Sequence, residues 1–361
     1  MKHAIISLMK HPAAKSALIT ALMFQVIFSL VWMTGYKNVS NNVHNLKIAL
    51  VTESNAQKEL ATRLKSALPF STVILDSRET AMKQLENRDI QMAAVFNADF
   101  TGQPLSSNKP ATIEYFINES NPQMIKAIME KTVATITDHT NLEATATPPA
   151  VVSDLHYLHP VNGTHNQMLP MMMLLASFVG AMIMQLNMQQ AAMTLSTRIG
   201  KWRLFGARTL INVAAAIVIS AVGSTLVLAL GGQNAGGFIA LWLFQSLFLA
   251  AFMFYSQMFL IVFGMPGMLL NIISLSVQLV TSGATIPREL LSGFYHNISA
   301  FLPATYAVNG LMNLLFGGPS IGHATSILIL FIVIYLGIST FAVMLRGKNK
   351  ASQIQPTPAH H

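Results

Sequence analysis

The chain has 361 residues, of which 52% are hydrophobic and only 10% are charged. This composition is too apolar for a soluble protein of this length and indicates an integral membrane protein. The formal net charge is +8, but the basic residues outside the central region gather in short segments that suit an anionic membrane surface, so we expect no nucleic-acid partner. No cysteine is present, so no disulfide can stabilise any part of the chain.

Six apolar stretches have lengths near the ~20 helical residues that the ~30 Å hydrocarbon core of a bilayer requires. None of them contains Asp, Glu, Lys or Arg. Because lipid offers no water to backbone groups, we expect each stretch to be a helix with its own hydrogen bonds closed. The predicted spans are residues 16–36, 167–188, 210–230, 238–263, 268–286 and 324–345.

The distribution of charge predicts the orientation of these spans. Basic residues without acidic ones occur before the first span, between the second and third, and after the sixth: Lys2, Lys10, Lys15; Arg198, Lys201, Arg203, Arg208; Arg346, Lys348 and Lys350. The positive-inside rule places these segments, both termini included, in the cytoplasm. Thirteen of the 14 acidic residues lie instead between residues 37 and 166, which are predicted to lie outside the membrane.

The amino-terminal segment is predicted to be retained. Residues 1–15 alternate basic and apolar residues, which indicates an amphipathic helix on the inner leaflet. The next stretch could be a cleaved signal peptide, but it is long and ends in Trp32-Met33-Thr34-Gly35-Tyr36 without a small-x-small cleavage site. A membrane anchor is the favoured interpretation. Residues 346–361 are predicted to form a cytoplasmic tail.

Residues 37–166 have the composition of a soluble α/β domain. Short runs rich in β-branched and apolar residues predict strands, and leucines spaced by four, or an Asn-Pro start, predict helices between them. The predicted strands are residues 47–51, 71–75, 92–96 and 112–117, and the predicted helices are 56–68, 79–88 and one that starts at Asn121-Pro122. The alternation favours a small mixed or parallel sheet covered by helices. The predicted fold class is therefore an α-helical polytopic membrane protein of six transmembrane helices, with an α/β extracytoplasmic domain between the first and second.

The end of this region, residues 143–166, shows little periodicity and is predicted to be a linker back to the membrane. It contains His156, His159 and His165, whose spacing matches no specific metal site. We interpret them as solvated linker residues and expect no metal.

The chemistry of catalysis and of nucleotide binding is missing from the sequence. It contains no Gly-x-x-x-x-Gly-Lys-Ser/Thr loop, and no nucleophile–base–acid arrangement stands out. The predicted spans carry no ionisable relay apart from His323 at the edge of the last one, which argues against a proton-coupled transporter. If the protein transports, its energy is expected to come from another subunit.

Residues 287–318 are too interrupted for an ordinary span, and a seventh span would move the basic tail outside. Two short helices that enter the outer leaflet and return fit better than a surface-lying loop. Pro303 is predicted to begin a helix, on which Tyr306 and Asn309 would share one face. Gly283 is predicted to allow a close helix approach. These residues, Gly283, Pro303, Tyr306 and Asn309, are the predicted outer gate.

The connection between the second and third spans, residues 190–208, mixes basic and aromatic residues. It fits an interfacial helix, and equally a docking site for a cytoplasmic partner. The residues expected to dock are Arg198, Lys201, Trp202, Arg203 and Phe205.

The predicted order is one span, an outer domain and five spans. Two segments stand out: Ser282-Gly283-Ala284-Thr285-Ile286-Pro287 and Phe301-Leu302-Pro303-Ala304-Thr305-Tyr306-Ala307-Val308-Asn309-Gly310-Leu311. This order and these segments resemble the ABC-2 type exporter permeases. Within them the chain looks like the YhgE/Pip (phage-infection-protein-like) branch, since residues 47–52, 92–101 and 115–121 are also similar to that branch's outer domain. The resemblance covers essentially the whole chain.

The resemblance implies the permease subunit of an exporter in a bacterial cell membrane, without enzymatic activity of its own. A cytosolic ABC ATPase would bind ATP and Mg²⁺ and dock on residues 190–208, and a second permease copy, identical or a paralogue, would complete the pathway. The substrate would be an amphipathic small molecule or lipid, because the spans offer only neutral polar groups, and Gln185, Asn271 and Gln278 are the expected lining. The alternative is a non-transporting membrane protein whose outer domain binds a partner, such as a phage or a secretion component.

Overall fold

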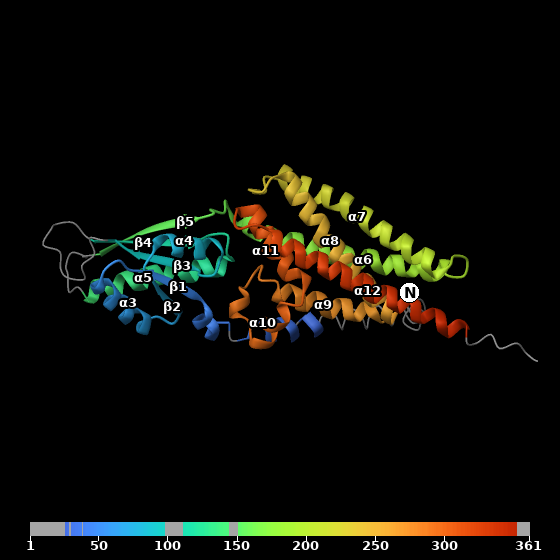
Figure 1. Cartoon of the computed structure of the whole chain (residues 1–361), viewed down its shortest axis with the longest axis horizontal. Coiled ribbons are helices and arrows are strands. Elements are labelled where there is room, and N and C mark those ends of the chain that lie inside the picture. The colour runs from blue at the N-terminus through green and yellow to red at the C-terminus, as the bar shows by residue number, and fades with distance from the viewer. Residues whose placement is uncertain (1–25, 29, 38, 98–110, 144–150, 352–361) are drawn as a thin grey trace, which may run out of the picture.

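The computed structural model describes residues 26–28, 30–37, 39–97, 111–143 and 151–351. An α/β domain lies at one end of the molecule and a bundle of apolar helices at the other (Figure 1). Several predicted segments lie outside the described residues. They are the predicted helix over residues 1–15, much of the predicted first span, residues 98–101 of the family-like segment 92–101, and the last ten residues.

The domain contains a five-stranded mixed sheet in the order β2-β1-β3-β4-β5. Its strands are β1 (Lys47–Val51), β2 (Ser71–Leu75), β3 (Met92–Phe96), β4 (Ala111–Asn118) and β5 (Val151–Leu158). β1 pairs in parallel with β2 and β3, β3 pairs antiparallel with β4, and β4 pairs in parallel with β5. The sheet is therefore mixed, one of the two arrangements that the sequence predicts.

Helices cover both faces of this sheet. α3 (Asn55–Ala67) and α5 (Gln123–Glu143) pack on one face, where Leu60, Leu64 and Met129 join the larger core. α4 (Arg78–Glu86) packs on the other face through Leu85. A capping box between Ser54 and Gln57 begins α3, because each side chain accepts a hydrogen bond from the other's backbone.

The fifth strand corrects one sequence-based prediction, because residues 143–166 were expected to be a linker. β5 lies within them and pairs with β4 from Ala111↔Val151 to Asn118↔Leu158. Only Val151 of this edge strand is buried, so the apolar alternation that identifies a strand is weak. His156 stacks on Phe116 of β4 with ring centroids 5.0 Å apart. It is thus a sheet residue and does not lie on a solvated linker.

Eight helical segments follow the α/β domain in the chain. They are α6 (Thr164–Leu195), α7 (Lys201–Ala229), α8 (Phe238–Phe263), α9 (Gly267–Thr281), the 3-10 turn η2 (Arg288–Leu290), α10 (Gly293–Ser299), α11 (Pro303–Phe316) and α12 (Gly322–Ala351). Four of them, α6, α7, α8 and α12, are long and apolar enough to cross a membrane. α10 and α11 form a pair bent by 75°, which would make five if the pair counts as one span.

The predicted spans 16–36 and 268–286 are not among these four helices of the described chain. α9 has 15 residues, fewer than the ~20 that a bilayer core requires. It ends at Thr281 because Gly283 adopts a positive φ of 83° and turns the chain before Ile286. The first predicted span is described only as the apolar helix Val26–Gly35. The structure therefore supports a polytopic membrane protein, while the count of six remains a prediction.

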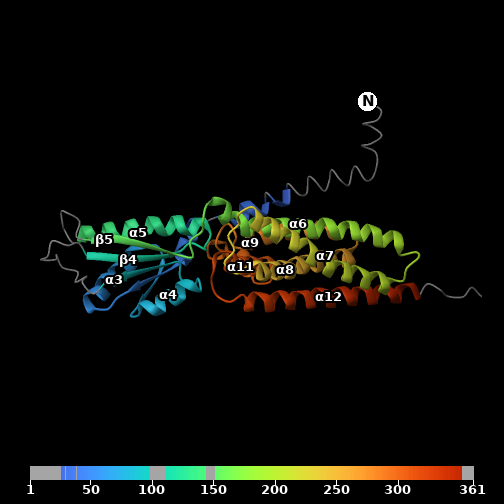
Figure 2. The ribbon, with the colours of Figure 1, turned by 90° about the horizontal axis from the view of Figure 1, so that it is seen from above.

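The two ends of the bundle differ. The turn between α6 and α7 and the end of α12 lie far from the α/β domain, whereas α11 and the α7–α8 connection lie beside it (Figures 1 and 2). α8 is mostly buried at the centre, and α7 is mostly exposed on one side. We refer to these as the domain-side end and the far end of the bundle.

Candidate functional site

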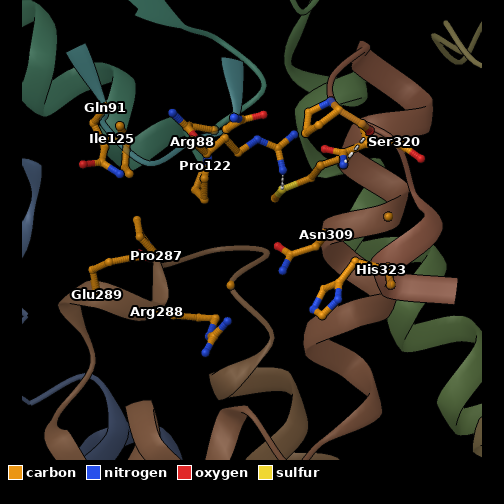
Figure 3. A pocket seen from close by; sticks show the side chains of 18 residues that line it. Arg88, Gln91, Pro122, Ile125, Pro287, Arg288, Glu289, Asn309, Ser320 and His323 are labelled. Atoms are coloured by element: carbon orange, nitrogen blue, oxygen red, sulfur yellow. Dashed lines mark hydrogen bonds between the residues drawn. The ribbon is translucent and has the colours of Figure 1, made fainter. Parts of the chain in front are cut away.

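A cavity of about 410 Å³ lies at the junction of the α/β domain and the bundle. The domain contributes Arg88, after α4, and Pro122, before α5. The bundle contributes Arg288 of η2, Asn309 of α11 and His323 of α12, and these side chains surround one space (Figure 3). We call this cavity the junction pocket. Two of the four predicted outer-gate residues, Gly283 and Asn309, line it.

The junction pocket is cationic. Arg88 donates from Nε and Nη2 to Ser120 Oγ at 3.3 and 3.0 Å, and Nη1 lies 3.8 Å from Met312 Sδ. Burial lowers the pKa of Arg88 to about 10, so the guanidinium stays charged at neutral pH. Arg288 donates from Nε to Ser299 Oγ at 2.8 Å. Glu289 is the one carboxylate on the described wall, so the pocket favours anionic or hydrogen-bond-accepting groups.

The segment from α9 to α10 ties the bundle to the domain. Leu290 of η2 is fully buried and belongs to the core of the domain, although it lies more than a hundred residues from it in the chain. Asn42 Nδ2 donates to the carbonyl of Leu290 at 3.0 Å, and Asn45 Nδ2 donates to the carbonyl of Glu289 at 3.0 Å. We call Leu290 with these two hydrogen bonds the Leu290 anchor. It makes the floor of the junction pocket continuous with the sheet domain.

The structure changes the role expected for Gly283. A Cβ there would meet only the Arg288 side chain, its Cγ at 3.4 Å and its Cδ at 3.8 Å, so no helix backbone approaches it closely. A glycine is required at position 283 because its φ is 83°, a value that other residues rarely adopt. Close approach occurs instead at Gly310, where a Cβ would overlap the Phe244 ring. α11 therefore packs against α8 through Gly310.

The other predicted gate residues lie on α11. Pro303 occupies its first turn, a position where its missing N–H costs nothing. Tyr306 and Asn309 both face the start of α12. The Tyr306 ring lies 6.0 Å from that of His323, and Asn309 lines the pocket with His323. The structure therefore brings Tyr306, Asn309 and His323 together. A gate formed by the predicted residues on α11 remains a proposal.

A line of polar residues runs through the bundle along α7. The buried residues of α7 are spaced by four along the helix, and all of them are polar or small. They are Arg208, Asn212, Ala216, Ser220 and Ser224. Asn212 bridges two helices, because Gln185 Nε2 donates to its Oδ1 at 2.7 Å and its Nδ2 donates to Gln257 Oε1 at 2.8 Å. We call these residues and their partners on α6 and α8 the polar seam.

The predicted lining residues are all buried in helix contacts. Gln185 belongs to the polar seam. Asn271 donates to the carbonyl of Ser256 at 3.4 Å. Gln278 joins α9 to α11, because its Oε1 accepts from Ala304 N at 3.2 Å. None of the three lines the junction pocket. A role in a substrate path therefore stays a proposal.

The residues expected to dock a partner lie at the far end. The described chain has no separate helix there, since α6 ends at Leu195 and α7 begins at Lys201. Trp202 is 47% exposed, and its ring lies 6.3 Å from that of Phe205. The set Arg198, Lys201, Trp202, Arg203 and Phe205 thus occupies the turn and the first turns of α7. Its basic and aromatic side chains present a surface that suits an interface.

Sequence reasoning did not single out Asn212, Gln257 or Leu290. The four-residue spacing along α7 was a readable signal for Asn212. Gln257 and Leu290 gave no local signal, because their roles depend on the packing of distant segments. Among the described residues, no three His, Asp or Glu side chains gather as they would around a metal ion.

The four long apolar helices, the bent helix pair and the appended sheet domain define a multi-pass membrane protein. A family model described as "ABC-2 family transporter protein" matches residues 15–341. The chain therefore belongs to the ABC-2 family of transporter proteins, as the sequence resemblance predicts.

One curated relative agrees with the predicted branch. The "Uncharacterized protein YhgE" of Bacillus subtilis (strain 168) is 34% identical over 109 residues. The match covers 29% of this chain but only 14% of the relative's length. No solved structure matches the chain.

Proposed function

We propose that this protein is the permease subunit of an ATP-driven exporter that moves an amphipathic substrate out of a bacterial cell. A separate cytosolic ATPase binds ATP and Mg²⁺ and docks at the far end of the bundle. A second copy of the chain, or a paralogue, completes the pathway. In this arrangement both termini are cytoplasmic and the α/β domain is outside.

One observation carries the proposal within the family. The basic and aromatic turn between α6 and α7 lies at one end of the bundle, and the bent α10–α11 pair with the junction pocket lies at the other (Figure 1). This separation gives one end for an ATPase and one for substrate exit. The positive-inside rule supports the same orientation, because the far end carries Arg198, Lys201 and Arg203.

The junction pocket can be tested by labelling, since the chain has no cysteine of its own. Asn309→Cys and Asn313→Cys place a thiol on the pocket wall, and Ala307→Cys and Leu311→Cys place one on the buried face of the same helix. In intact cells a membrane-impermeant thiol reagent should label the first pair and not the second. Trapping the ATPase with nucleotide should change the labelling of the first pair. Equal labelling of all four, independent of nucleotide, would refute an outer gate on α11.

The docking surface needs its own test. Trp202→Ala combined with Phe205→Ala should weaken ATPase association in a pulldown by at least tenfold, because buried interface aromatics commonly contribute about 2 kcal/mol or more each. Phe294→Ala is the matched control: this aromatic is 66% exposed at the domain-side end of the bundle. If the double variant weakens ATPase association no more than Phe294→Ala does, or not at all, the ATPase docks elsewhere.

A further inference from the structure

A second cavity, of about 480 Å³, opens at the far end of the bundle. The end of α6, the turn to α7 and the first turns of α7 surround it, together with Ile261 of α8 and Val343 in the second half of α12. Its wall combines two cations and a polar amide with apolar side chains. The cations are Lys201 and Arg208, the amide is Gln189, and the apolar side chains include Ile199, Phe205 and Val343. We call it the far-end pocket. A mixed wall of this kind suits a molecule with an anionic group and an apolar part.

Arg208 is the unusual member of this wall, because it is only 5% exposed. Its Nη1 donates to Gln189 Oε1 at 2.7 Å. Its Nε and Nη2 are buried and have no hydrogen-bond partner. These two nitrogens form one edge of the guanidinium, the edge that binds two oxygens of a phosphate or carboxylate side by side.

Among the described residues, no Asp or Glu lines the far-end pocket around Arg208. From residue 155 to residue 361 the only acidic residue is Glu289, and it lies at the junction pocket at the other end of the bundle. A buried guanidinium without a counter-charge is costly, and such groups are normally paired. The unpaired edge therefore indicates a charge that comes from outside the chain.

Lys201 adds a second cation at the mouth of the pocket. Its Nζ donates to the carbonyl of Val343 at 3.1 Å and lies 5.7 Å from the centre of the Trp202 ring. An ammonium has three donors, so these contacts leave capacity for a ligand oxygen. Ile199, Leu204 and Ile261 line the remaining wall and can contact hydrocarbon.

We propose that the far-end pocket binds a phosphate-type anion, with the Arg208 edge on two of its oxygens and Lys201 on a third. An anionic phospholipid of the adjoining leaflet supplies such a group together with acyl chains for the apolar wall. Free inorganic phosphate shares the headgroup chemistry without the chains. The site does not depend on an ATPase or on transport, so its test is separate from that of the proposed function.

The test uses the purified full-length chain in phosphatidylcholine nanodiscs that contain either brominated phosphatidylglycerol or brominated phosphatidylcholine. Trp32→Phe and Trp242→Phe leave Trp202, beside Lys201, as the only tryptophan. Brominated phosphatidylglycerol should quench Trp202 with an apparent affinity about tenfold higher than the zwitterionic lipid. That ratio corresponds to about 1.4 kcal/mol.

Arg208→Gln should remove most of this preference, and Arg208→Lys should retain part of it. Arg203→Gln is the control, because it removes the same charge from an exposed neighbour that does not line the pocket. If inorganic phosphate at millimolar concentration abolishes the preference, the site also accepts the free anion. If it does not, the headgroup and chains bind together. Either result supports the proposal.

The proposal is overturned if Arg208→Gln and Arg203→Gln reduce the preference equally, or if Arg208→Gln affects only ATPase association. Should Arg208→Gln fail to fold, native mass spectrometry of the unaltered protein and of Lys201→Gln decides. The site is supported if the unaltered protein retains phosphatidylglycerol over phosphatidylcholine after delipidation and Lys201→Gln reduces this preference. Equal retention of the two lipids overturns it.

Discussion

Helices α3 and α7 are both amphipathic, but they bury opposite kinds of side chain. α3 hides Leu60 and Leu64 against the sheet and shows charged residues such as Lys58 and Glu59 outside. α7 hides Asn212, Ser220 and Ser224 and shows apolar residues outside. The exposed ones include Leu210, Ile211, Val218, Ile219, Val222 and Leu226.

The difference shows which solvent each helix meets. In water, apolar burial stabilises α3. Against lipid, apolar side chains gain little from being hidden, so α7 associates through small residues and interhelical hydrogen bonds. The inversion between the two helices is therefore independent evidence that the bundle lies in a membrane and the domain does not.

The largest effect is expected in α3. Leu64→Ala should destabilise the α/β domain by about 2–5 kcal/mol, because it removes buried methyl groups and leaves a cavity. Hydrogen exchange of the full-length protein in nanodiscs should show loss of protection in β1 and β3. Lys65→Ala, on the exposed side of α3, is the control and should leave protection unchanged. If the two changes have equal effects, α3 does not pack as described.

A smaller effect is expected from Asn212 in the polar seam. Asn212→Ala should cost about 1–2 kcal/mol, since it leaves the amides of Gln185 and Gln257 without their shared partner. An SDS unfolding titration in bicelles measures this cost. Combining it with Gln185→Ala should be less than additive. Strict additivity would mean that the two side chains do not interact.

The smallest effect is expected at Ser220, whose hydroxyl bonds that of Ser246 on α8. Ser220→Ala keeps the small size that permits close packing and removes only the hydrogen bond, so about 0.6 kcal/mol is expected in the same titration. Ser220→Leu should cost more, because a large side chain would separate α7 from α8. The reverse order would show that hydrogen bonding, rather than close approach, dominates this contact.

Much of the α/β domain can be predicted from local sequence. β1, β2 and β3 occupy the residues expected from their apolar and β-branched runs, and α3 and α4 differ by a residue or two at their ends. β5 could not be predicted in this way. It is an edge strand whose side chains are largely exposed, and its partner β4 determines its register.

The candidate sites are harder to predict from the sequence than the helices and strands that carry them. Proline and glycine specify backbone geometry, so the start of α11 at Pro303 was predictable, although the reason for Gly283 was not. The partners of Asn212 and Arg208 depend on how three helices align, which no single segment encodes. The unpaired edge of Arg208 is visible only once that alignment is known.

The Leu290 anchor sets a threshold for motion at the domain-side end. Withdrawing this side chain from the domain core would leave a leucine-sized hole, at a cost of about 2–5 kcal/mol. At about 2 kcal/mol the withdrawn state would be populated at only a few per cent, so the described contact would be kept in nearly all molecules. A ligand that favours release by a similar amount would free this contact. The position of the sheet domain would thereby depend on the state of the helices to which Leu290 belongs.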